Sequence, residues 1–246
     1  MTRILLEVCV DDAAGIAAAT EGGADRIELC AALALGGLTP SAGLMALASG
    51  CGVPVMAMIR PRAGDFVWTA PEIAAMQAEI AAARSFGLSG VVIGASRPDG
   101  RLDGATLATL AAAARGLDVT LHRAIDLTPD PAEAMRLCAS LGIGRVLSSG
   151  GAATAVQGLD RLAGMVAAAP GITVMPGGGV GVDTLGLLAE RLPLRDVHAS
   201  CSAPVPRPRD PKVRGLGFQP PGARATDAAK VRALRTALDR LPRRGG

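Results

Sequence analysis

Aromatic residues are scarce in this chain, which has no tyrosine, one tryptophan and three phenylalanines among its 246 residues. Proteins that bind single-stranded nucleic acid usually stack bases on aromatic side chains within a basic groove. Positive charges gather late in the chain, after Pro206, but the formal net charge is only +3. We therefore expect no nucleic-acid partner and interpret the late basic residues as the solvated face of a final helix.

Long hydrophobic runs are also missing, because glycine, proline or charged residues interrupt each apolar stretch before it reaches membrane-spanning length. The apolar start, Met1 to Val10, is too short for the core of a signal peptide with its flanks, and it leads directly into Asp11 and Asp12. The five cysteines are odd in number and widely spaced, which does not suggest a disulfide framework. We expect a cytoplasmic protein with reduced thiols and no membrane partner.

Short aliphatic segments alternate with alanine-rich amphipathic segments from one end of the chain to the other. Pro71–Phe86 illustrates the second type, with Ile73, Met76 and Ile80 at helical spacing, a proline in the first turn and Gly87 just past the end. The pattern predicts strands at Ile4–Val10, Arg26–Cys30, Val53–Arg60, Gly90–Ala95, Val119–Ala124, Arg145–Ser149, Ile172–Met175 and Val197–Cys201. It predicts helices at Ala13–Glu21, Ser41–Ala48, Pro71–Phe86, Gly104–Arg115, Pro131–Leu141, Val156–Ala169, Asp183–Glu190 and Asp227–Leu241.

This alternation predicts a single-domain α/β fold, a (β/α)8 TIM barrel over residues 1–246, a fold that usually takes about 250 residues. An open doubly wound sheet is the alternative, but it requires a glycine-rich turn after the first strand, where this sequence has Asp11 and Asp12. Residues 203–226 are rich in proline and lack periodicity. We expect them to form a long loop before the closing helix, over the mouth of the barrel.

Charged and hydrogen-bonding side chains interrupt strands that should be almost continuously apolar in a parallel sheet. Side chains alternate along a strand, so residues two apart share a face. The sets that share a face in this way are Glu7 with Cys9, Glu28 with Cys30, Met56 and Met58 with Arg60, Thr120 with His122, and His198 with Ser200. If these faces point inward, their polar groups meet at the C-terminal end of the barrel, where the sites of this fold lie. The alternative is a structural network of Glu–Arg ion pairs that satisfies itself.

The loops after the strands add further polar groups. Arg60, Arg62 and Asp65 stand in the segment IRPRAGDF, and Arg123 follows His122. These side chains could bind an anionic substrate at the mouth of the barrel. Ordinary turn chemistry and solvated charge are the alternative interpretation of the loop residues.

Three successive glycines, Gly177, Gly178 and Gly179, follow the seventh strand. Their bare backbone N–H groups could wrap an anion, because the loops after strands seven and eight are the usual phosphate-binding place in this fold. Ser149, after the sixth strand, could line the same pocket. The alternative is a sharp turn that only glycine can adopt.

Seven strings occur in a characteristic order: LLEVCVD, ADRIELCAA, GGLTPS, MIRPRAGDF, TLHRAID, RVLSSG and DVHASCS. In this order and spacing they resemble the CutC family of copper-homeostasis proteins. The resemblance implies a cytoplasmic barrel that forms a homodimer or a higher homo-oligomer. It also implies Cu(I) binding through Cys9 and Cys30 at the ends of the first two strands, which suits the preference of Cu(I) for soft thiolate ligands.

Two functional hypotheses follow. The first is a protein of copper homeostasis that binds Cu(I), with Cys9 and Cys30 as its ligands. The second is an enzyme with a small anionic or phosphorylated substrate, in which proton transfer is carried by Glu7, Glu28, His122 and His198. Its substrate-binding residues would be Arg60, Arg62, Asp65, Arg123, Ser149, Gly177, Gly178, Gly179 and Ser200. No organic cofactor is expected, and a barrel without catalysis, its polar lining paired with itself, is a third possibility.

Overall fold

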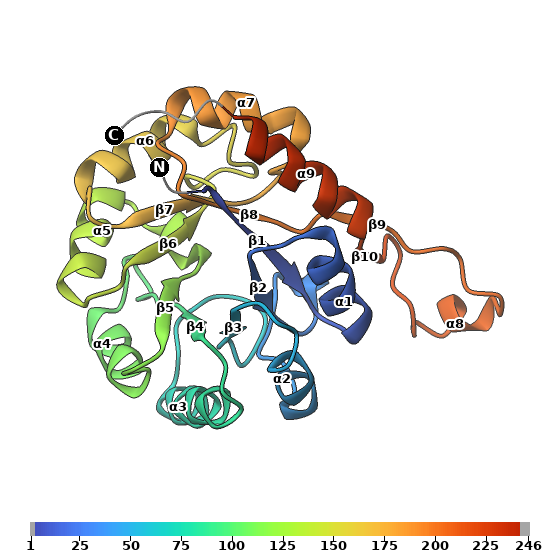
Figure 1. The fold of residues 1–246 in the computed structure, drawn as a ribbon. Coiled ribbons are helices and arrows are strands. Elements are labelled where there is room, and N and C mark those ends of the chain that lie inside the picture. The colour runs from blue at the N-terminus through green and yellow to red at the C-terminus, as the bar shows by residue number, and fades with distance from the viewer. Residues whose placement is uncertain (1–2, 242–246) are drawn as a thin grey trace.

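Eight parallel strands form a nearly closed barrel with helices around its outside, as the computed structural model in Figure 1 shows. The structure describes residues 3–241; residues 1–2 and 242–246, at the two ends of the predicted domain, lie outside the described part. The barrel strands are β1 (Leu5–Val10), β2 (Arg26–Leu29), β3 (Val55–Met58), β4 (Gly90–Ile93), β5 (Asp118–Leu121), β6 (Arg145–Ser148), β7 (Thr173–Pro176) and β8 (Asp196–Ala199). The predicted (β/α)8 fold is confirmed, and no observed barrel strand has more residues than the corresponding predicted strand.

The strand order is β7-β6-β5-β4-β3-β2-β1-β8, and β7 lies beside β8, which brings the two ends of the sheet together. The register places chemically important residues opposite one another. Glu7 on β1 stands opposite Arg26 on β2 and opposite His198 on β8. Cys9 stands opposite Glu28. Residues that are far apart in the sequence therefore share one level of the barrel.

The helices that cover the barrel begin at residues suited to that position. Asp12 accepts a hydrogen bond from the Gly15 amide at the start of α1, and Thr69 and Glu72 form a capping box at the start of α3. The helices are α1 (Ala13–Gly22), α2 (Ala42–Ala48), α3 (Ala70–Ser85), α4 (Gly104–Ala113), α5 (Pro131–Ser140), α6 (Leu159–Ala168), α7 (Val182–Arg191), α8 (Lys212–Gly215) and α9 (Ala228–Arg240), with 3-10 turns η1 (Leu33–Leu35) and η2 (Arg123–Leu127). None of the helices within residues 3–241 combines the length and the apolar character that crossing a bilayer demands.

The apolar core lies mainly between the barrel and its helices. Leu6, Val8 and Val10 of β1 belong to this layer, together with Ile27 and Leu29 of β2. Because side chains alternate along a strand, the residues between them point into the barrel. These are the polar residues that the sequence analysis singled out, so the barrel interior is where its charges have to be satisfied.

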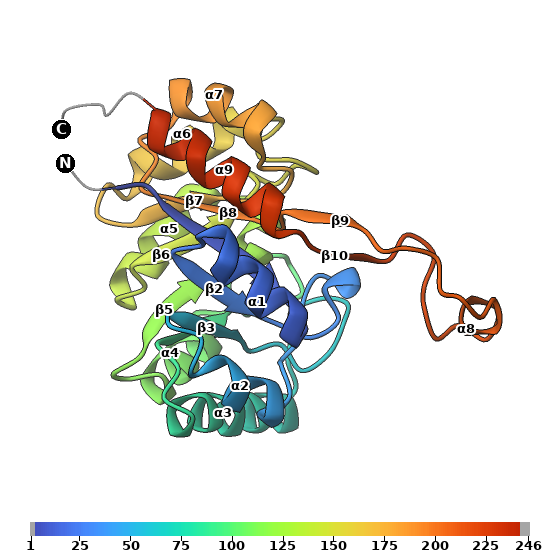
Figure 2. The ribbon, with the colours of Figure 1, turned by 45° about the vertical axis from the view of Figure 1, so that its right-hand side comes forward.

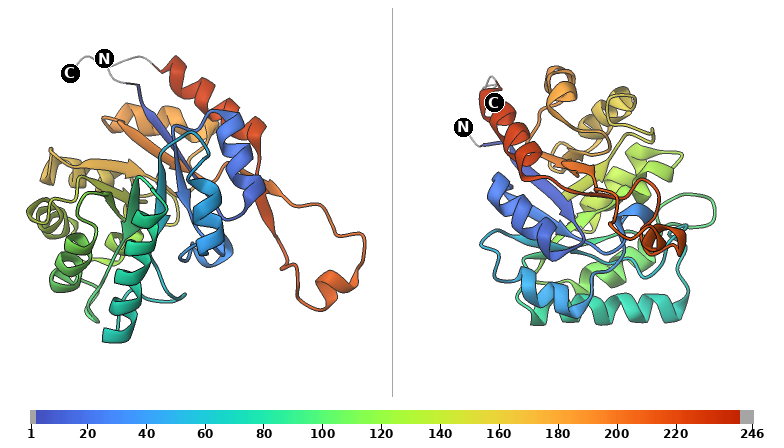
Figure 3. Two further views of the ribbon diagram at one scale, coloured as in Figure 1. Left: turned by 60° about the horizontal axis from the view of Figure 1, so that its bottom comes forward. Right: turned by 90° about the vertical axis from the view of Figure 1, so that its right-hand side faces the viewer.

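Residues 203–226 differ from the prediction of a loop over the mouth. β9 (Ser202–Pro204) and β10 (Arg224–Thr226) pair as an antiparallel ribbon, and α8 lies at the far end of an arm that extends outward from the barrel (Figures 2 and 3). Arg224 fixes the base of the arm, because its guanidinium donates to the Ser202 hydroxyl and carbonyl oxygens. Strands of three residues within a proline-rich segment give no readable alternation, which is why the sequence did not reveal the ribbon.

Candidate functional site

A cavity of about 260 Å³ opens at the C-terminal ends of the strands. Nine of the residues that the sequence analysis proposed for the site line it: Cys9, Glu28, Arg60, His122, Arg123, Gly178, Gly179, His198 and Ser200. The rest of the lining is mostly apolar and includes Leu33, Met58, Phe66, Leu147 and Val180. The polar side chains that strand alternation predicted to face inward therefore meet at one cavity.

Below the cavity, Glu7 is completely buried and holds two cationic groups. Its Oε2 accepts from Arg26 Nε at 2.5 Å, and its Oε1 lies 2.9 Å from His198 Nδ1. Arg26 also contacts Asp196, at 2.7 Å between Nη2 and Oδ2, and Arg145 Nε reaches the same Asp196 oxygen at 3.0 Å. Glu7 is thus a fixed structural carboxylate beneath the site rather than part of its lining.

Sequence reasoning did not single out Arg26, Arg145 or Asp196. A signal for two of them was available, because Arg26 stands two residues before Glu28 and Asp196 stands two residues before His198. Residues with that spacing share the inward face of a strand. A charged residue at the start of a barrel strand, two residues before an inward-facing residue, also faces the interior. There it needs an oppositely charged or hydrogen-bonding partner.

The pKa values follow from this arrangement. Burial raises the pKa of Glu7, but the hydrogen bond from His198 and the charge of Arg26 outweigh burial and lower it to about 2. Burial lowers the pKa of His198, but the charge of Glu28 and the other partners of the ring raise it well above its usual value. His198 is therefore an imidazolium between two carboxylates, since its Nε2 also lies 3.8 Å from Glu28 Oε2.

Glu28 faces the cavity from β2, and burial raises its pKa. Its Oε2 accepts from the Cys30 thiol at 3.5 Å. Burial, with the charge of Glu28, raises the pKa of Cys30 well above its usual value, and the thiol packs with Met56, Met58 and Val92. Cys30 thus lies behind Glu28 and not on the cavity wall.

Three side chains of the site could hold a metal ion. One ligand atom from each of Cys9, Glu28 and His198 lies within 4.8 Å of the others, and all three residues are buried. Cys9 thus belongs to this group, as the prediction of a metal ligand requires. Cys30 is not a member of the group, although its thiol touches the same glutamate.

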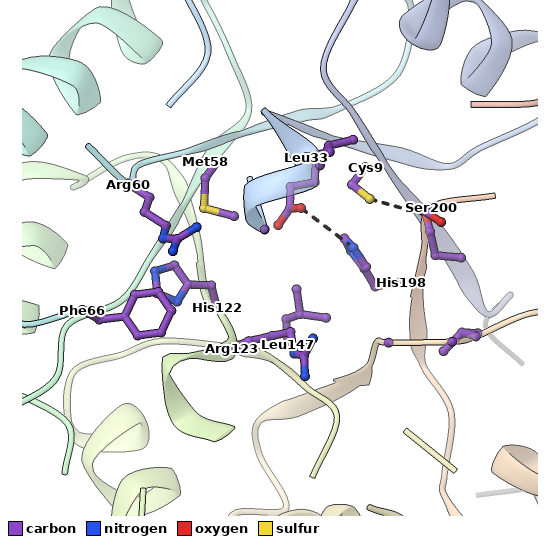
Figure 4. A pocket seen from close by; sticks show the side chains of 16 residues that line it. Cys9, Leu33, Met58, Arg60, Phe66, His122, Arg123, Leu147, His198 and Ser200 are labelled. Atoms are coloured by element: carbon purple, nitrogen blue, oxygen red, sulfur yellow. Dashed lines mark hydrogen bonds and ion pairs between the residues drawn. The ribbon is translucent and has the colours of Figure 1, made fainter. Parts of the chain in front are cut away.

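Arg60 and His122 line the cavity together, on the side away from Cys9 and His198 (Figure 4). The Arg60 guanidinium donates to the carbonyl oxygens of Leu35, Gly37 and Gly64 at 2.8–3.0 Å, and it lies 5.1 Å from the centre of the Phe66 ring. No carboxylate among residues 3–241 forms an ion pair with it, so its charge is balanced only by peptide dipoles. Burial and the charge of Arg60 lower the pKa of His122 to about 3, which keeps this imidazole neutral.

Three buried polar atoms of the cavity residues have no hydrogen-bond partner within the described part of the chain: Glu28 Oε1, Arg60 Nε and His122 Nε2. Leaving a buried polar group unpaired costs about 1–3 kcal/mol, and most native structures avoid it. The three residues come from β2, the end of β3 and the end of β5, yet all three line one hollow. A polar ligand in the cavity would satisfy them together.

Arg62 and Asp65, which the sequence analysis proposed as substrate-binding residues, do not line the cavity. Arg62 Nε donates to Glu72 at 2.5 Å, its Nη2 lies 3.0 Å from Asp65, and its guanidinium lies 4.8 Å from the Trp68 ring. Arg62 therefore fastens its own loop to the start of α3. The sequence could not distinguish it from Arg60, because Glu72 becomes a neighbour only when the loop folds back.

Ser149 and Gly177 also lie outside the lining. The Ser149 hydroxyl accepts from Arg123 Nη2 at 2.6 Å and contacts Asp126, so Ser149 orients Arg123 at the cavity edge. Gly178 and Gly179 do line the cavity, with φ values of 90° and 71° that favour glycine. Within residues 3–241 their amides donate to no other group, which agrees with an anion-binding turn.

Known proteins resemble this chain in sequence and in fold. Residues 4–203 match the model of the CutC family. The chain belongs to the CutC family. The family protein CutC of Sinorhizobium medicae is 54% identical over 242 residues, which are 98% of each chain, and that of Caulobacter vibrioides strain NA1000 is 49% identical over 97% of this chain and 98% of its own. The crystal structure of CutC from Streptococcus agalactiae is 28% identical, with a TM-score of 0.76 over 80% of this chain and 98% of its own.

The buried ion pairs predict a large difference between two arginine variants. Arg26→Met leaves Glu7 and Asp196 without their shared cation, so we expect the free energy of unfolding to fall by about 3–5 kcal/mol. The control is Arg232→Met, because Arg232 pairs with Glu21 where the side chains are 57% and 69% exposed, and it should cost less than about 1 kcal/mol. Urea unfolding measures both; equal losses would contradict the account of the barrel interior.

The neutral state of His122 predicts a dependence of stability on pH. The unfolded chain takes up this proton near pH 6.5 and the folded chain only near pH 3, so stability present above pH 6.5 is lost as the pH falls toward 3. The loss amounts to a few kcal/mol, at about 1.4 kcal/mol per pKa unit. His122→Gln removes this proton but leaves the other titrating groups, so unfolding free energies should fall less steeply with acid in the variant. Identical pH profiles would rule out a buried neutral His122.

Proposed function

We propose that the chain is an enzyme that binds a small organic anion in the cavity and transfers a proton to or from it. The single observation that carries this proposal is that three residues lining one cavity, Glu28, Arg60 and His122, each keep a buried polar atom without a partner. Two of them belong to hydrogen-bond donors and one to a carboxylate with a raised pKa. A substrate that accepts hydrogen bonds at one end and exchanges a proton at the other would satisfy all three.

The charge distribution favours an anionic substrate. Arg60 brings a positive charge with no carboxylate partner to the cavity, and Arg123 and the amides of Gly178 and Gly179 add donors at the edge. An arginine in a partly desolvated site binds a carboxylate or phosphate group strongly and with a defined orientation. The cavity volume of about 260 Å³ suits a molecule of metabolite size rather than a polymer.

Glu28 and His198 support the proton-transfer part of the proposal. Burial raises the pKa of Glu28, so its carboxylate form is a stronger base than that of an ordinary glutamate. His198 lies 3.8 Å away as an imidazolium, and its other nitrogen is held by Glu7 at 2.9 Å. Glu7 and the arginine below it thereby fix the ring, and the ring can stabilise negative charge on Glu28 whenever Glu28 gives up its proton.

The proposal predicts that simple anions bind. We expect at least one of oxalate, malonate and inorganic phosphate to bind to the purified protein in isothermal titration calorimetry, and Arg60→Gln to weaken that binding at least about tenfold. Arg97→Gln is the control, because Arg97 is an exposed partner of Asp99 away from the cavity. Unfolding curves verify that both variants fold. Failure of all three anions to bind, or equal affinities in the two variants, would contradict the proposal.

Copper binding is the second candidate, favoured by the ligand group of Cys9, Glu28 and His198. The related CutC from Streptococcus agalactiae is described as a candidate copper homeostasis protein. We therefore include a role in copper homeostasis in the proposal for this chain. One thiol, one imidazole and one carboxylate suit a divalent ion such as Cu²⁺ or Zn²⁺ by their chemistry, whereas Cu(I) prefers thiolate and thioether ligands. Cu(I) would therefore need Cys30 or Met58 beside Cys9.

Copper uptake predicts a specific pattern among the cysteine variants. Cys9→Ser should lower stoichiometric Cu(I) uptake against a competing chelator, and Cys30→Ser should lower it if Cys30 rather than Met58 is the second soft ligand. Cys51→Ser, at a partly exposed cysteine outside the cavity lining, should not. If His198 is a ligand, Nε2 must first release its proton, so the affinity should fall as the pH falls. Unchanged uptake by Cys9→Ser would contradict a copper site here.

The predictions of a cytoplasmic location and of a homodimer or higher homo-oligomer rest on the family resemblance. They stay predictions, as part of the same proposal.

A further inference from the structure

We infer that His122 is a neutral hydrogen-bond donor that forms, with Arg60, a binding site for a substrate oxygen on which negative charge develops. The inference rests on the proposed function and specifies the chemical class of its substrate. A group that holds a developing oxyanion opposite a carboxylate base suits a molecule with a carbonyl or carboxylate group next to an acidic C–H bond. The substrate class is therefore a small carbonyl compound or carboxylic acid that can form an enolate.

The tautomer of His122 follows from its contacts. The Ala124 amide donates to His122 Nδ1 at 3.1 Å, so Nδ1 carries the lone pair. In a neutral imidazole the proton is then on Nε2. That Nε2–H is buried, lines the cavity through its ring and has no acceptor within residues 3–241. A buried N–H without an acceptor, on a ring that borders a hollow, is a candidate site for an oxygen of a ligand.

The position of the ring is fixed by its neighbours. A Cβ atom at Gly94 would lie 2.1 Å from His122 Cε1, so the ring occupies space that only glycine leaves free. The Phe66 ring packs against the imidazole at a tilt of 44°, with 4.7 Å between ring centres. The backbone at Gly94 is itself held by Trp68, whose Nε1 donates to the Gly94 carbonyl at 2.8 Å. Little rearrangement is needed for the imidazole to donate, as a preorganised site requires.

The two sides of the cavity have different chemistry. Arg60, His122 and Phe66 lie together on one side, while Cys9 and His198 lie on the other (Figure 4). Glu28 belongs to the second side, because its carboxylate forms the ion pair with His198. Burial and the charge of Arg60 keep a second proton off His122, and the charge of Arg60 also attracts the substrate oxygen. A substrate placed between the two sides would have its oxygen at His122 and its C–H bond toward Glu28.

The chemical step that this geometry supports is an enolisation. Glu28, as the carboxylate, takes the proton from the carbon next to the carbonyl group. The electron pair of the broken C–H bond forms the new C=C bond, and the C=O π pair moves onto the oxygen. The resulting oxyanion is held by the His122 Nε2–H and the Arg60 guanidinium, and return of the proton from Glu28 to carbon completes the exchange.

Nitrogen NMR of the imidazole rings tests the assignment without a known substrate. The chain has only two histidines, so ¹⁵N-histidine labelling gives two ring systems, which a His198→Gln variant assigns. We expect His122 to carry its proton on Nε2 and to stay neutral between about pH 5 and 8. Oxalate, a planar dianion that resembles an enolate, should shift the Nε2–H signal. A proton on Nδ1, or titration of His122 near the usual pKa of histidine, would overturn the inference.

Three variants separate hydrogen bonding from packing. His122→Phe keeps a ring but removes the donor, and we expect oxalate affinity to fall about ten- to a hundredfold. His122→Gln keeps an N–H near the Nε2 position and should retain affinity within a few fold. Gly94→Ala pushes the ring from its place and should resemble His122→Phe. Thermal unfolding identifies any variant that does not fold, and the NMR result stands independently of all three.

The possible outcomes distinguish this inference from the proposed function. If oxalate or another anion binds to the wild-type protein but leaves the His122 signal and the His122→Phe affinity unchanged, the cavity binds anions and the role of His122 is wrong. If no anion binds, the proposed function fails and the role of His122 fails with it. Binding with the predicted shift and the predicted loss supports both.

Discussion

The ion pair between Glu7 and Arg26 is the interaction on which the rest of this barrel depends. A buried charge without a partner costs several kcal/mol, so each charged group in the interior requires the next. From Glu7 the contacts run through Arg26 to Asp196, Arg145 and Asp118 in one direction and through His198 to Glu28 in the other. The series ends at Asp118, 47% exposed at one end of the barrel, and at the cavity at the other. Among residues 3–241, the charged groups of this series below the cavity are thus all paired, whereas Glu28 at the cavity keeps one oxygen without a partner.

That difference explains why the site can be located without a bound ligand. A structural network would satisfy its own members, as Glu7, Arg26 and Asp196 do. Within residues 3–241, the hydrogen bonds of Arg60 at the cavity go only to carbonyl groups, and Glu28 and His122 each keep one buried atom without a partner. The self-satisfied network considered from the sequence is therefore correct for the lower part of the barrel and insufficient for the upper part. The copper hypothesis concerns the same upper part, because an ion bound by Cys9, Glu28 and His198 would have to displace the proton on His198 Nε2, which faces Glu28.

Much of the fold could be predicted from the sequence, because hydrophobic period and helix boundary residues act locally. The helix predicted at Pro71–Phe86 is α3, Ala70–Ser85. Strand alternation predicted that Glu28, His122 and His198 face the interior, and all three line the cavity. What failed depends on contacts between distant residues. Arg60 and Arg62 cannot be told apart in the sequence. Only the folded structure shows that Arg62 forms an ion pair with Glu72 of α3 and so holds its loop in place. Asp196 becomes a partner of Arg26 across 170 residues, a pairing that no local pattern contains.

If Arg60, His122 and Glu28 together bind one small anion, a crystal of the protein soaked in oxalate should show it. We expect density for one oxalate in the cavity, with an oxygen within hydrogen-bond distance of both His122 Nε2 and the Arg60 guanidinium and with the molecule facing Glu28. A cavity that stays free of oxalate, with Glu28 turned to pair with Arg60, would contradict it. Oxalate bound elsewhere while the three residues satisfy one another would contradict it equally.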